Sequence, residues 1–146
     1  MPVNNICRIS GRPLEHIINF GDQPLGNGFF DIKSPKSEYL FNMSVGFCQE
    51  SKMFQLFDQP DPKLMFHDQY AFFSSTSKLM QAHFKDFYQF IVDSPYLRKD
   101  PFIVELGSND GILLKNFSDA NYNHLGIEPS ENVAKVSNLY GVKTIN

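Results

Sequence analysis

One stretch of this 146-residue chain decides its fold: Pro101-Phe102-Ile103-Val104-Glu105-Leu106-Gly107-Ser108-Asn109-Asp110-Gly111. Residues 101–107 form an almost continuous apolar run, which is typical of a parallel strand covered on both faces. The glycines that follow predict a sharp loop, and residues 111–117 have the spacing of a short amphipathic helix. A strand, a glycine loop and a helix in this order predict an α/β fold.

The residues after this stretch continue the same pattern. Residues 124–129 predict a second short strand, and Ser130 is a candidate N-cap for the helix that follows it. Gly141 stands where a glycine commonly ends a helix, and residues 142–145 begin a third strand. We therefore expect residues 99–146 to form the first strands of a Rossmann-like sheet that is incomplete within this chain.

The first part of the chain has a different character. Glycine and proline recur through residues 1–60 without a helical period, which predicts a small β-rich module. Within it, residues 40–47 and 52–57 predict a hairpin. A helical connector, residues 61–98, follows, and its apolar residues recur at spacings of three and four between positions 75 and 92.

The composition is that of an ordinary globular chain, with 42% hydrophobic and 20% charged residues. A net charge of −3 predicts neither a nucleic acid nor a membrane partner. The sequence has no apolar run of bilayer length and no secretory signal, so we expect a cytoplasmic protein. The 15 Phe and 6 Tyr must be buried in a core or covered by another surface. A protein partner or a second copy of the chain could provide that surface.

The glycine loop has the residue types of a cofactor cradle. Gly107 lets the chain turn off the strand and lets a ligand approach the backbone, while Gly111 permits close packing where the helix begins. Asn109 occupies the place of a middle glycine, and asparagine tolerates a positive φ. The helix N-terminus would then offer N–H groups to an anionic group, such as a pyrophosphate or the carboxylate of a methionine moiety.

Two acidic residues bear on the choice of cofactor. Glu105 suits an ammonium group rather than phosphates, and Glu128, at the end of the second strand, can accept both hydroxyls of a ribose. Together they favour S-adenosylmethionine over NADP and, less strongly, over NAD; the alternative is an ordinary strand–turn–helix. The predicted cofactor-binding residues are Glu105, Gly107, Ser108, Asn109, Asp110, Gly111, Glu128 and Ser130.

Over nearly its full length the chain resembles the sugar C-methyltransferases, which act on nucleotide-linked deoxysugars. The motifs that carry the resemblance are Cys7-Arg8-Ile9-Ser10-Gly11, residues 20–29, Phe47-Cys48-Gln49-Glu50-Ser51 with Gln55-Leu56, residues 70–75 with His83-Phe84, and residues 105–111 followed by Gly126-Ile127-Glu128-Pro129-Ser130. The resemblance implies a zinc module, a helical connector and a Rossmann-like methyltransferase domain. It also implies methyl transfer from S-adenosylmethionine to a carbon beside a sugar ketone.

The zinc positions depart from the family pattern. Two Cys-x-x-Cys pairs are replaced by Cys7-x-x-Ser10 and Cys48-x-x-Ser51. A serine hydroxyl is a poor zinc ligand because it would have to lose its proton. Neither His16 nor His67 has a spacing that supplies the missing ligands, so we expect no bound zinc, with the two cysteines as small buried hydrophobic residues.

The segment before the connector helix has two interpretations. The resemblance places Tyr70 in the wall of the active-site cleft, and His83 is a second candidate there. The residue types themselves predict that Ser74 to Ser77 cap the helix, with Ser75 a candidate cap, and that Phe72 and Phe73 are core. Other catalytic residues are unassigned.

Three functions are consistent with the sequence. The first is the N-terminal part of a C-methyltransferase, catalytically incomplete as it stands, whose nucleotide-sugar substrate would need the remaining half of the sheet. The second is a non-enzymatic interaction module. The third is a fragment of an NAD-dependent nucleotide-sugar enzyme, against which the acidic Glu105 and the order of the two domains argue.

Overall fold

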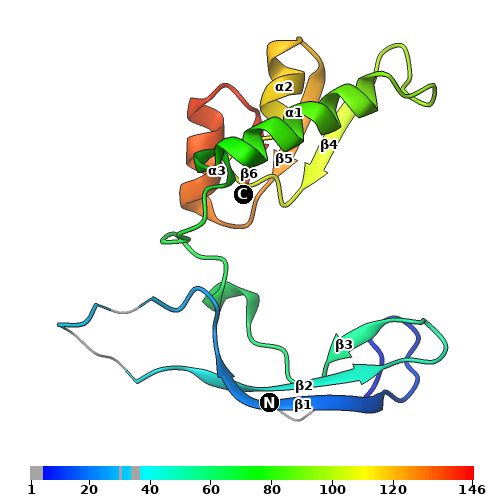
Figure 1. The fold of residues 1–146 in the computed structure, drawn as a ribbon, viewed down its shortest axis with the longest axis vertical. Helices are drawn as coiled ribbons and strands as arrows, with labels where there is room; N and C mark the ends of the chain where they lie inside the picture. Colours follow the sequence, from blue (N-terminus) through cyan, green and yellow to red (C-terminus); the bar gives the residue numbers. More distant parts are fainter. Residues whose placement is uncertain (1–4, 30, 34–36) are drawn as a thin grey trace. The chain divides into compact units, whose positions relative to one another are not determined.

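The computed structural model describes residues 5–29, 31–33 and 37–146. The chain divides into two compact units, Met1–Met65 and Phe66–Asn146, and each has its own three-stranded sheet (Figure 1). The helix expected in the connector belongs to the second unit. The combination of strands and helices agrees with the predicted α/β class.

The sheet of the first unit is antiparallel, in the order β1 (Glu15–Pro24), β2 (Leu40–Phe47) and β3 (Phe54–Leu56). The predicted hairpin is confirmed, with Val45 of β2 opposite Leu56 of β3. The sequence pattern does not single out the long strand β1, because two register shifts interrupt its pairing with β2 and Gly21 adopts a φ of +76°. Such irregularities break the alternation of polar and apolar side chains.

The first unit buries few apolar side chains. Among its described residues, only Cys7, Cys48 and Phe57 are buried hydrophobic residues. The ring of Phe57 packs directly on Gly46, where an added Cβ would come within 2.7 Å of it. Because a small unit with so little core is stabilised weakly by burial, the polar contacts around the two cysteines matter to it.

The sheet of the second unit is parallel, in the order β4 (Phe102–Leu106), β5 (Asn123–Ile127) and β6 (Thr144–Ile145). Helix α2 (Leu114–Asp119) connects β4 to β5, and α3 (Glu131–Leu139) connects β5 to β6. Helix α1 (Lys78–Val92) precedes β4 (Figure 1). This arrangement is compatible with the start of a Rossmann-like sheet.

The core of the second unit lies where α1 and α2 pack on the sheet. Its buried residues are Leu113, Leu114, Phe117 and Val142, and the residues packed against them include Phe84, Tyr88, Ile91 and Val92 of α1 and Ile103 of β4. The ring of Tyr88 meets that of Phe117 edge-on at 4.8 Å between centroids. The helices therefore cover the face of the sheet that carries Ile103.

The opposite face of β4 is open. Phe102, Val104 and Leu106 are 61%, 48% and 78% exposed, and β4 is an edge strand. The apolar run is typical of a strand covered on both faces, but within an incomplete sheet such a strand is left with an unpaired edge and an uncovered face. The apolar run is there, but the described residues supply helices to one face only.

Two helix starts also differ from prediction. Helix α2 begins at Leu114 rather than at Gly111, because Gly111 has a φ of +80°, which an α-helix does not allow. Helix α1 is capped by Ser77, whose hydroxyl accepts from the N–H of Met80. Ser75 is not the cap; it lies in the preceding 3-10 turn, Ser74–Thr76. The predicted glycine end of α3 agrees with Gly141, at a φ of +82°.

No helix among the described residues has the length and apolarity needed to cross a membrane. The longest of them, α1, has 15 residues and carries charges at Lys78, Lys85 and Asp86.

Gly126 is a position where a side chain should not fit. An added Cβ would lie 2.5 Å from Ser108 Oγ and 2.8 Å from Thr144 Oγ1. We expect Gly126→Ala to lower the free energy of unfolding of the second unit by about 1–3 kcal/mol, measured by urea denaturation. Gly26→Ala is the control, because no atom lies within 4 Å of the Cβ added there. An unchanged denaturation midpoint for Gly126→Ala would show that the loop and β5 are less closely packed than described.

Candidate functional site

The loop after β4 has an unusual backbone. Gly107, Asn109 and Gly111 have φ values of +73°, +50° and +80°, so the predicted tolerance of Asn109 for this conformation is confirmed. An added Cβ at Gly107 meets no atom within 4 Å, whereas at Gly111 it would lie 2.6 Å from Ser137 Oγ. Gly111 is thus needed for packing, as predicted, and Gly107 leaves the backbone open to a ligand.

Glu128 holds this loop in place. Its side chain is only 4% exposed, and its two oxygens accept from the backbone N–H groups of Asn109, at 2.9 Å, and Ser130, at 2.8 Å. These bonds tie the loop after β4 to the start of α3. Because each carboxylate oxygen has further acceptor capacity, the predicted contact with ribose hydroxyls stays a prediction.

A segment from the connector is bound to the same loop; we call residues 70–76 the strap. The side chain of Asn109 accepts from the N–H of Ser74 at 2.9 Å and donates to the carbonyl of Phe72 at 3.1 Å. The carboxylate of Asp110 accepts from the hydroxyl of Ser75 at 2.6 Å and from its N–H at 3.0 Å. Asn109 and Asp110 are predicted to contact a cofactor, but in the structure these side-chain hydrogen bonds hold the strap.

The strap reaches α3 as well, since the side-chain amide of Asn132 donates to the carbonyl of Tyr70 at 2.8 Å. Sequence reasoning missed these contacts because the residues lie far apart in the chain and no pattern links them. Phe72, predicted to be core, is 49% exposed, because the strap turns its backbone rather than this side chain to the loop.

Tyr70 and His83 have different surroundings. The ring of Tyr70 contacts Phe66 and Phe72 at 5.8 and 5.5 Å between centroids, while His83 is exposed on α1 beside Phe84. No described contact joins Tyr70 to His83. Their predicted place in a substrate cleft stays a prediction.

Three of the predicted cofactor residues have buried polar atoms without a hydrogen-bond partner: Glu105 Oε2, Ser108 Oγ and Ser130 Oγ. Ser108 and Ser130 are 1% and 0% exposed. Desolvation by burial raises the pKa of Glu105 from 4.5 to about 7. A buried polar group without a partner costs about 1–3 kcal/mol, so a ligand that supplied a partner to the half-buried Glu105 would be bound favourably.

The structure does not support an anion site at the start of α2. This helix has six residues and begins three positions after Gly111, and its N-cap residue Leu113 makes no side-chain cap. Any ligand at this end of the sheet would therefore be held by the loop itself and by the polar groups around it.

The four degenerate zinc positions lie together in the first unit. Cys7 and Cys48 are 1% and 0% exposed. Cys7 Sγ lies 3.3 Å from Ser51 Oγ, and Cys48 Sγ lies 3.3 Å from Ser10 Oγ. Each cysteine thus contacts the serine of the other turn, and we call these four residues the Cys–Ser cluster.

The environment of the two sulfurs is polar, which corrects the expectation that they are simple hydrophobic residues. Cys7 Sγ accepts from the side-chain amide of Gln55 at 2.9 Å and from the N–H groups of Ile9 and Ser10 at 3.4 and 3.5 Å. Cys48 Sγ accepts from the N–H of Ser51 at 3.5 Å. The cysteines are buried, as predicted, but among hydrogen-bond donors.

These donors change the acidity of both thiols. Burial by itself raises the pKa of Cys7, but hydrogen bonds from Ser10, Ser51 and the backbone outweigh it and lower the pKa from 9.0 to about 5. The hydroxyls of Ser10 and Ser51 also lower the pKa of Cys48, which the neighbouring Cys7 side chain opposes.

The cluster does not fit a structural zinc site. Two thiols and two hydroxyls supply only half of the thiolate or imidazole ligands that a closed zinc tetrahedron uses. Within the part of the chain that the structure describes, no group of three or more His, Cys, Asp or Glu side chains comes together to hold a metal.

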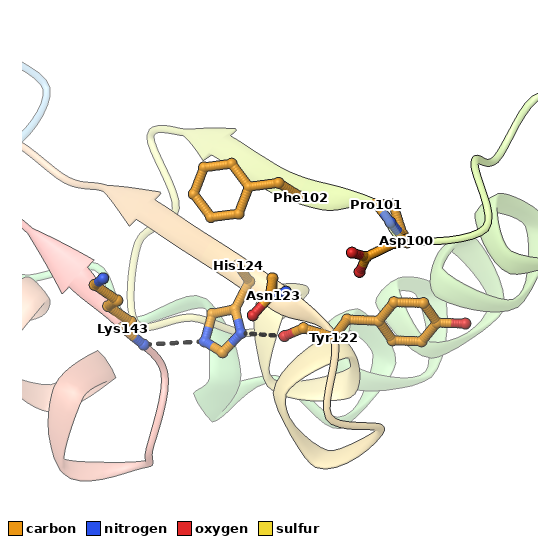
Figure 2. Close-up of a pocket in the computed structure, with 7 residues that line it drawn as sticks. All are labelled: Asp100, Pro101, Phe102, Tyr122, Asn123, His124 and Lys143. Carbon is orange, nitrogen blue, oxygen red and sulfur yellow. Dashed lines mark hydrogen bonds between the residues drawn. The ribbon is translucent and has the colours of Figure 1, made fainter.

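A pocket of about 420 Å³ lies at the other end of the second sheet, where β4 and β5 begin (Figure 2). His124 is fixed there between two backbone groups: Nε2 accepts from the N–H of Lys143 at 3.0 Å, and Nδ1 lies 2.9 Å from the carbonyl of Tyr122. The first bond assigns the proton to Nδ1. None of the predicted site residues lines this pocket.

Comparison with known proteins agrees with the motifs. Residues 7–66 match a methyltransferase family model described as "Putative zinc binding domain". The C-methyltransferase NovU of Streptomyces niveus is 30% identical to this chain over 141 residues, which are 95% of the chain and 33% of NovU. The chain is therefore similar, over nearly its full length, to a C-methyltransferase. It spans about a third of the length of NovU, and the alignment includes both units.

The hydrogen bond from Ser75 to Asp110 offers a test of the strap. Ser75→Ala removes a hydroxyl donor from a carboxylate that is 2% exposed. We expect the free energy of unfolding of the second unit to fall by about 1–2 kcal/mol, measured by urea denaturation. In the control Thr76→Ala, the lost hydroxyl donates only to Phe73 within the same turn, by the described contacts. Equal losses for the two variants would contradict the strap.

Proposed function

We propose that the second unit binds S-adenosylmethionine at the loop after β4, as the cofactor-binding part of a cytoplasmic C-methyltransferase. The observation that carries the proposal is the backbone of the loop, which is open at Gly107, two residues after Glu105, whose buried Oε2 has no hydrogen-bond partner. The similarity to a C-methyltransferase over 95% of the chain supports this cofactor over NAD.

The residues of the loop would share the work of holding the cofactor. The open backbone at Gly107 would admit the methionine moiety, and the carboxylate of Glu105 would accept from its ammonium group. Glu128 would accept from ribose hydroxyls while it keeps the loop tied to α3. When bound, S-adenosylmethionine supplies an electrophilic methyl group on a sulfonium.

For the whole protein, we propose that the methyl acceptor is a carbon beside the ketone of a nucleotide-linked deoxysugar. A carbon nucleophile of this kind needs a base to remove its proton and a group to stabilise the enolate oxygen. Tyr70 and His83 are the candidates in this chain for contact with that sugar. The proposed role of the described residues is cofactor binding, with catalysis depending on further groups.

A second candidate function is an interaction module. It is favoured by the open face of β4, where Phe102, Val104 and Leu106 are exposed. Apolar side chains gathered on one sheet face are typical of a surface that another polypeptide covers. A protein partner or a second copy of the chain would serve.

Calorimetry distinguishes these candidates. We expect heat of binding with S-adenosylmethionine and S-adenosylhomocysteine and none with NAD. We expect Gly107→Val to lose this heat of binding, because the valine side chain would occupy the open space beside the loop and its backbone would be forced into an unfavourable φ. Binding of NAD alone would overturn the proposed cofactor, and binding of none of the three would favour the interaction module.

The pKa of Glu105, raised to about 7, predicts a pH dependence of binding. Below that pH the carboxyl is neutral and must release its proton before it can pair with an ammonium group. Affinity for S-adenosylhomocysteine should therefore rise about tenfold from pH 6 to pH 8, as followed by calorimetry. Glu105→Gln should bind more weakly and lose most of this dependence.

The same group affects the stability of the free protein with the opposite sign. The folded chain holds the Glu105 proton more tightly than the unfolded chain does, so stability should fall as the pH rises from about 4.5 to about 7. Glu105→Gln should remove that part of the slope. Glu131→Gln is the control, because Glu131 is exposed and paired with Lys135. For the binding experiment, a tenfold rise in affinity for S-adenosylhomocysteine between pH 6 and pH 8 that persists in Glu105→Gln would exclude Glu105 as the source of that rise.

A further inference from the structure

We propose that Cys7 and Cys48 form a redox site in which peroxide converts the two thiols into an intramolecular disulfide. The site is the Cys–Ser cluster of the first unit, and the proposal is independent of cofactor binding by the second unit.

The fold brings the two sulfurs together from distant parts of the sequence. Cys7 lies in the turn before β1, and Cys48 lies in the turn between β2 and β3. Each sulfur is 3.3 Å from the serine hydroxyl of the opposite turn, so the two turns interlock. Ser10 links the two sulfurs, because its N–H donates to Cys7 Sγ at 3.5 Å while its hydroxyl lies 3.3 Å from Cys48 Sγ.

The cluster leaves the thiols available for chemistry. A thiolate bound to zinc is protected by the metal, but this donor set does not fit zinc. The hydroxyls and N–H groups around each sulfur favour the thiolate, which is the nucleophilic form of cysteine. Ser10 and Ser51, which contact the two sulfurs, are half-buried, so the cluster lies near the surface of the first unit.

The reaction balances with hydrogen peroxide as the oxidant. A thiolate of one cysteine attacks a peroxide oxygen, the O–O bond breaks, and the hydroxide that leaves takes up a proton to form water. The resulting sulfenic acid is attacked at sulfur by the second thiolate, the S–O bond breaks, and a second water leaves. Two thiols lose two electrons and two protons, and peroxide is reduced to two waters.

The disulfide would join the two turns that, in a zinc module, the metal joins. It would cross-link the ends of a long loop that contains β1 and β2, in a unit with few buried apolar side chains. A cross-link of this kind restricts the unfolded chain and so stabilises the folded one. Oxidation should therefore raise the melting temperature of the first unit.

The experiment uses the full chain, first reduced and freed of reductant, then exposed to one equivalent of hydrogen peroxide. Because the chain has two cysteines, any intramolecular disulfide joins Cys7 to Cys48. We expect both free thiols to be lost, the intact mass to fall by two hydrogens, and the melting temperature to rise. A thiol reductant should reverse all three changes.

Two variants make the test specific. Cys7→Ser leaves one thiol, so it should show neither the loss of two hydrogens nor the rise in melting temperature. The double variant Ser10→Cys with Ser51→Cys restores four thiols. It should bind zinc with near-unit stoichiometry and resist peroxide until the metal is chelated, whereas the natural chain should oxidise equally fast with or without added zinc.

Several results would overturn the proposal. These are disulfides formed only between chains, oxidation of single cysteines to sulfinic acid without a cross-link, two thiols that survive the peroxide, or zinc that binds the natural chain and protects both sulfurs.

Discussion

The carboxylate of Glu128 is the contact on which the described site depends. It is almost fully buried, and each of its oxygens accepts a backbone N–H, one from the loop after β4 and one from the start of α3. These bonds tie the left-handed Asn109 and the turn at Ser130 to one carboxylate, in addition to the backbone bonds from Gly107 and Ser108 to the carbonyl of Ile127. Hydrogen bonds that a carboxylate accepts from backbone N–H groups are among the strong ones, so this contact fixes the loop relative to the start of α3.

The strap adds a second layer to the same loop. Asn109 and Asp110 point their polar groups at the backbone of residues 72–75, so a segment far away in the sequence is held against the cofactor loop. The buried side-chain atoms without a partner among the described residues are Glu105 Oε2, Ser108 Oγ, Ser130 Oγ and Asn132 Oδ1. Asn109 and Asp110 therefore build the site by holding the strap, whereas Glu105 keeps an oxygen that a ligand could use.

The first unit holds two turns together without the full ligand set of a zinc site. The two turns face each other, and N–H groups point at the two sulfurs. The hydroxyls of Ser10 and Ser51 pair with the thiols of the opposite turns. Each hydrogen bond needs only one donor and one acceptor, whereas a structural zinc site needs four ligands. The two turns can therefore be held together by hydrogen bonds where zinc could not hold them.

The sequence by itself determined the order of the elements in the second unit, the hairpin in the first, and the positive φ of Asn109, because apolar periodicity, glycine placement and asparagine chemistry are local properties. It also indicated the family, since the motifs are contiguous residues. The tertiary structure alone decided that Asp110 binds Ser75, that Glu128 is a clamp, and that Cys7 meets Ser51. These contacts join residues far apart in the chain, and nothing in local spacing encodes which polar side chain will find which partner. The tertiary structure also decided which face of β4 is covered. An apolar run indicates that both faces of a strand can be buried, but it does not indicate which helices lie on each face.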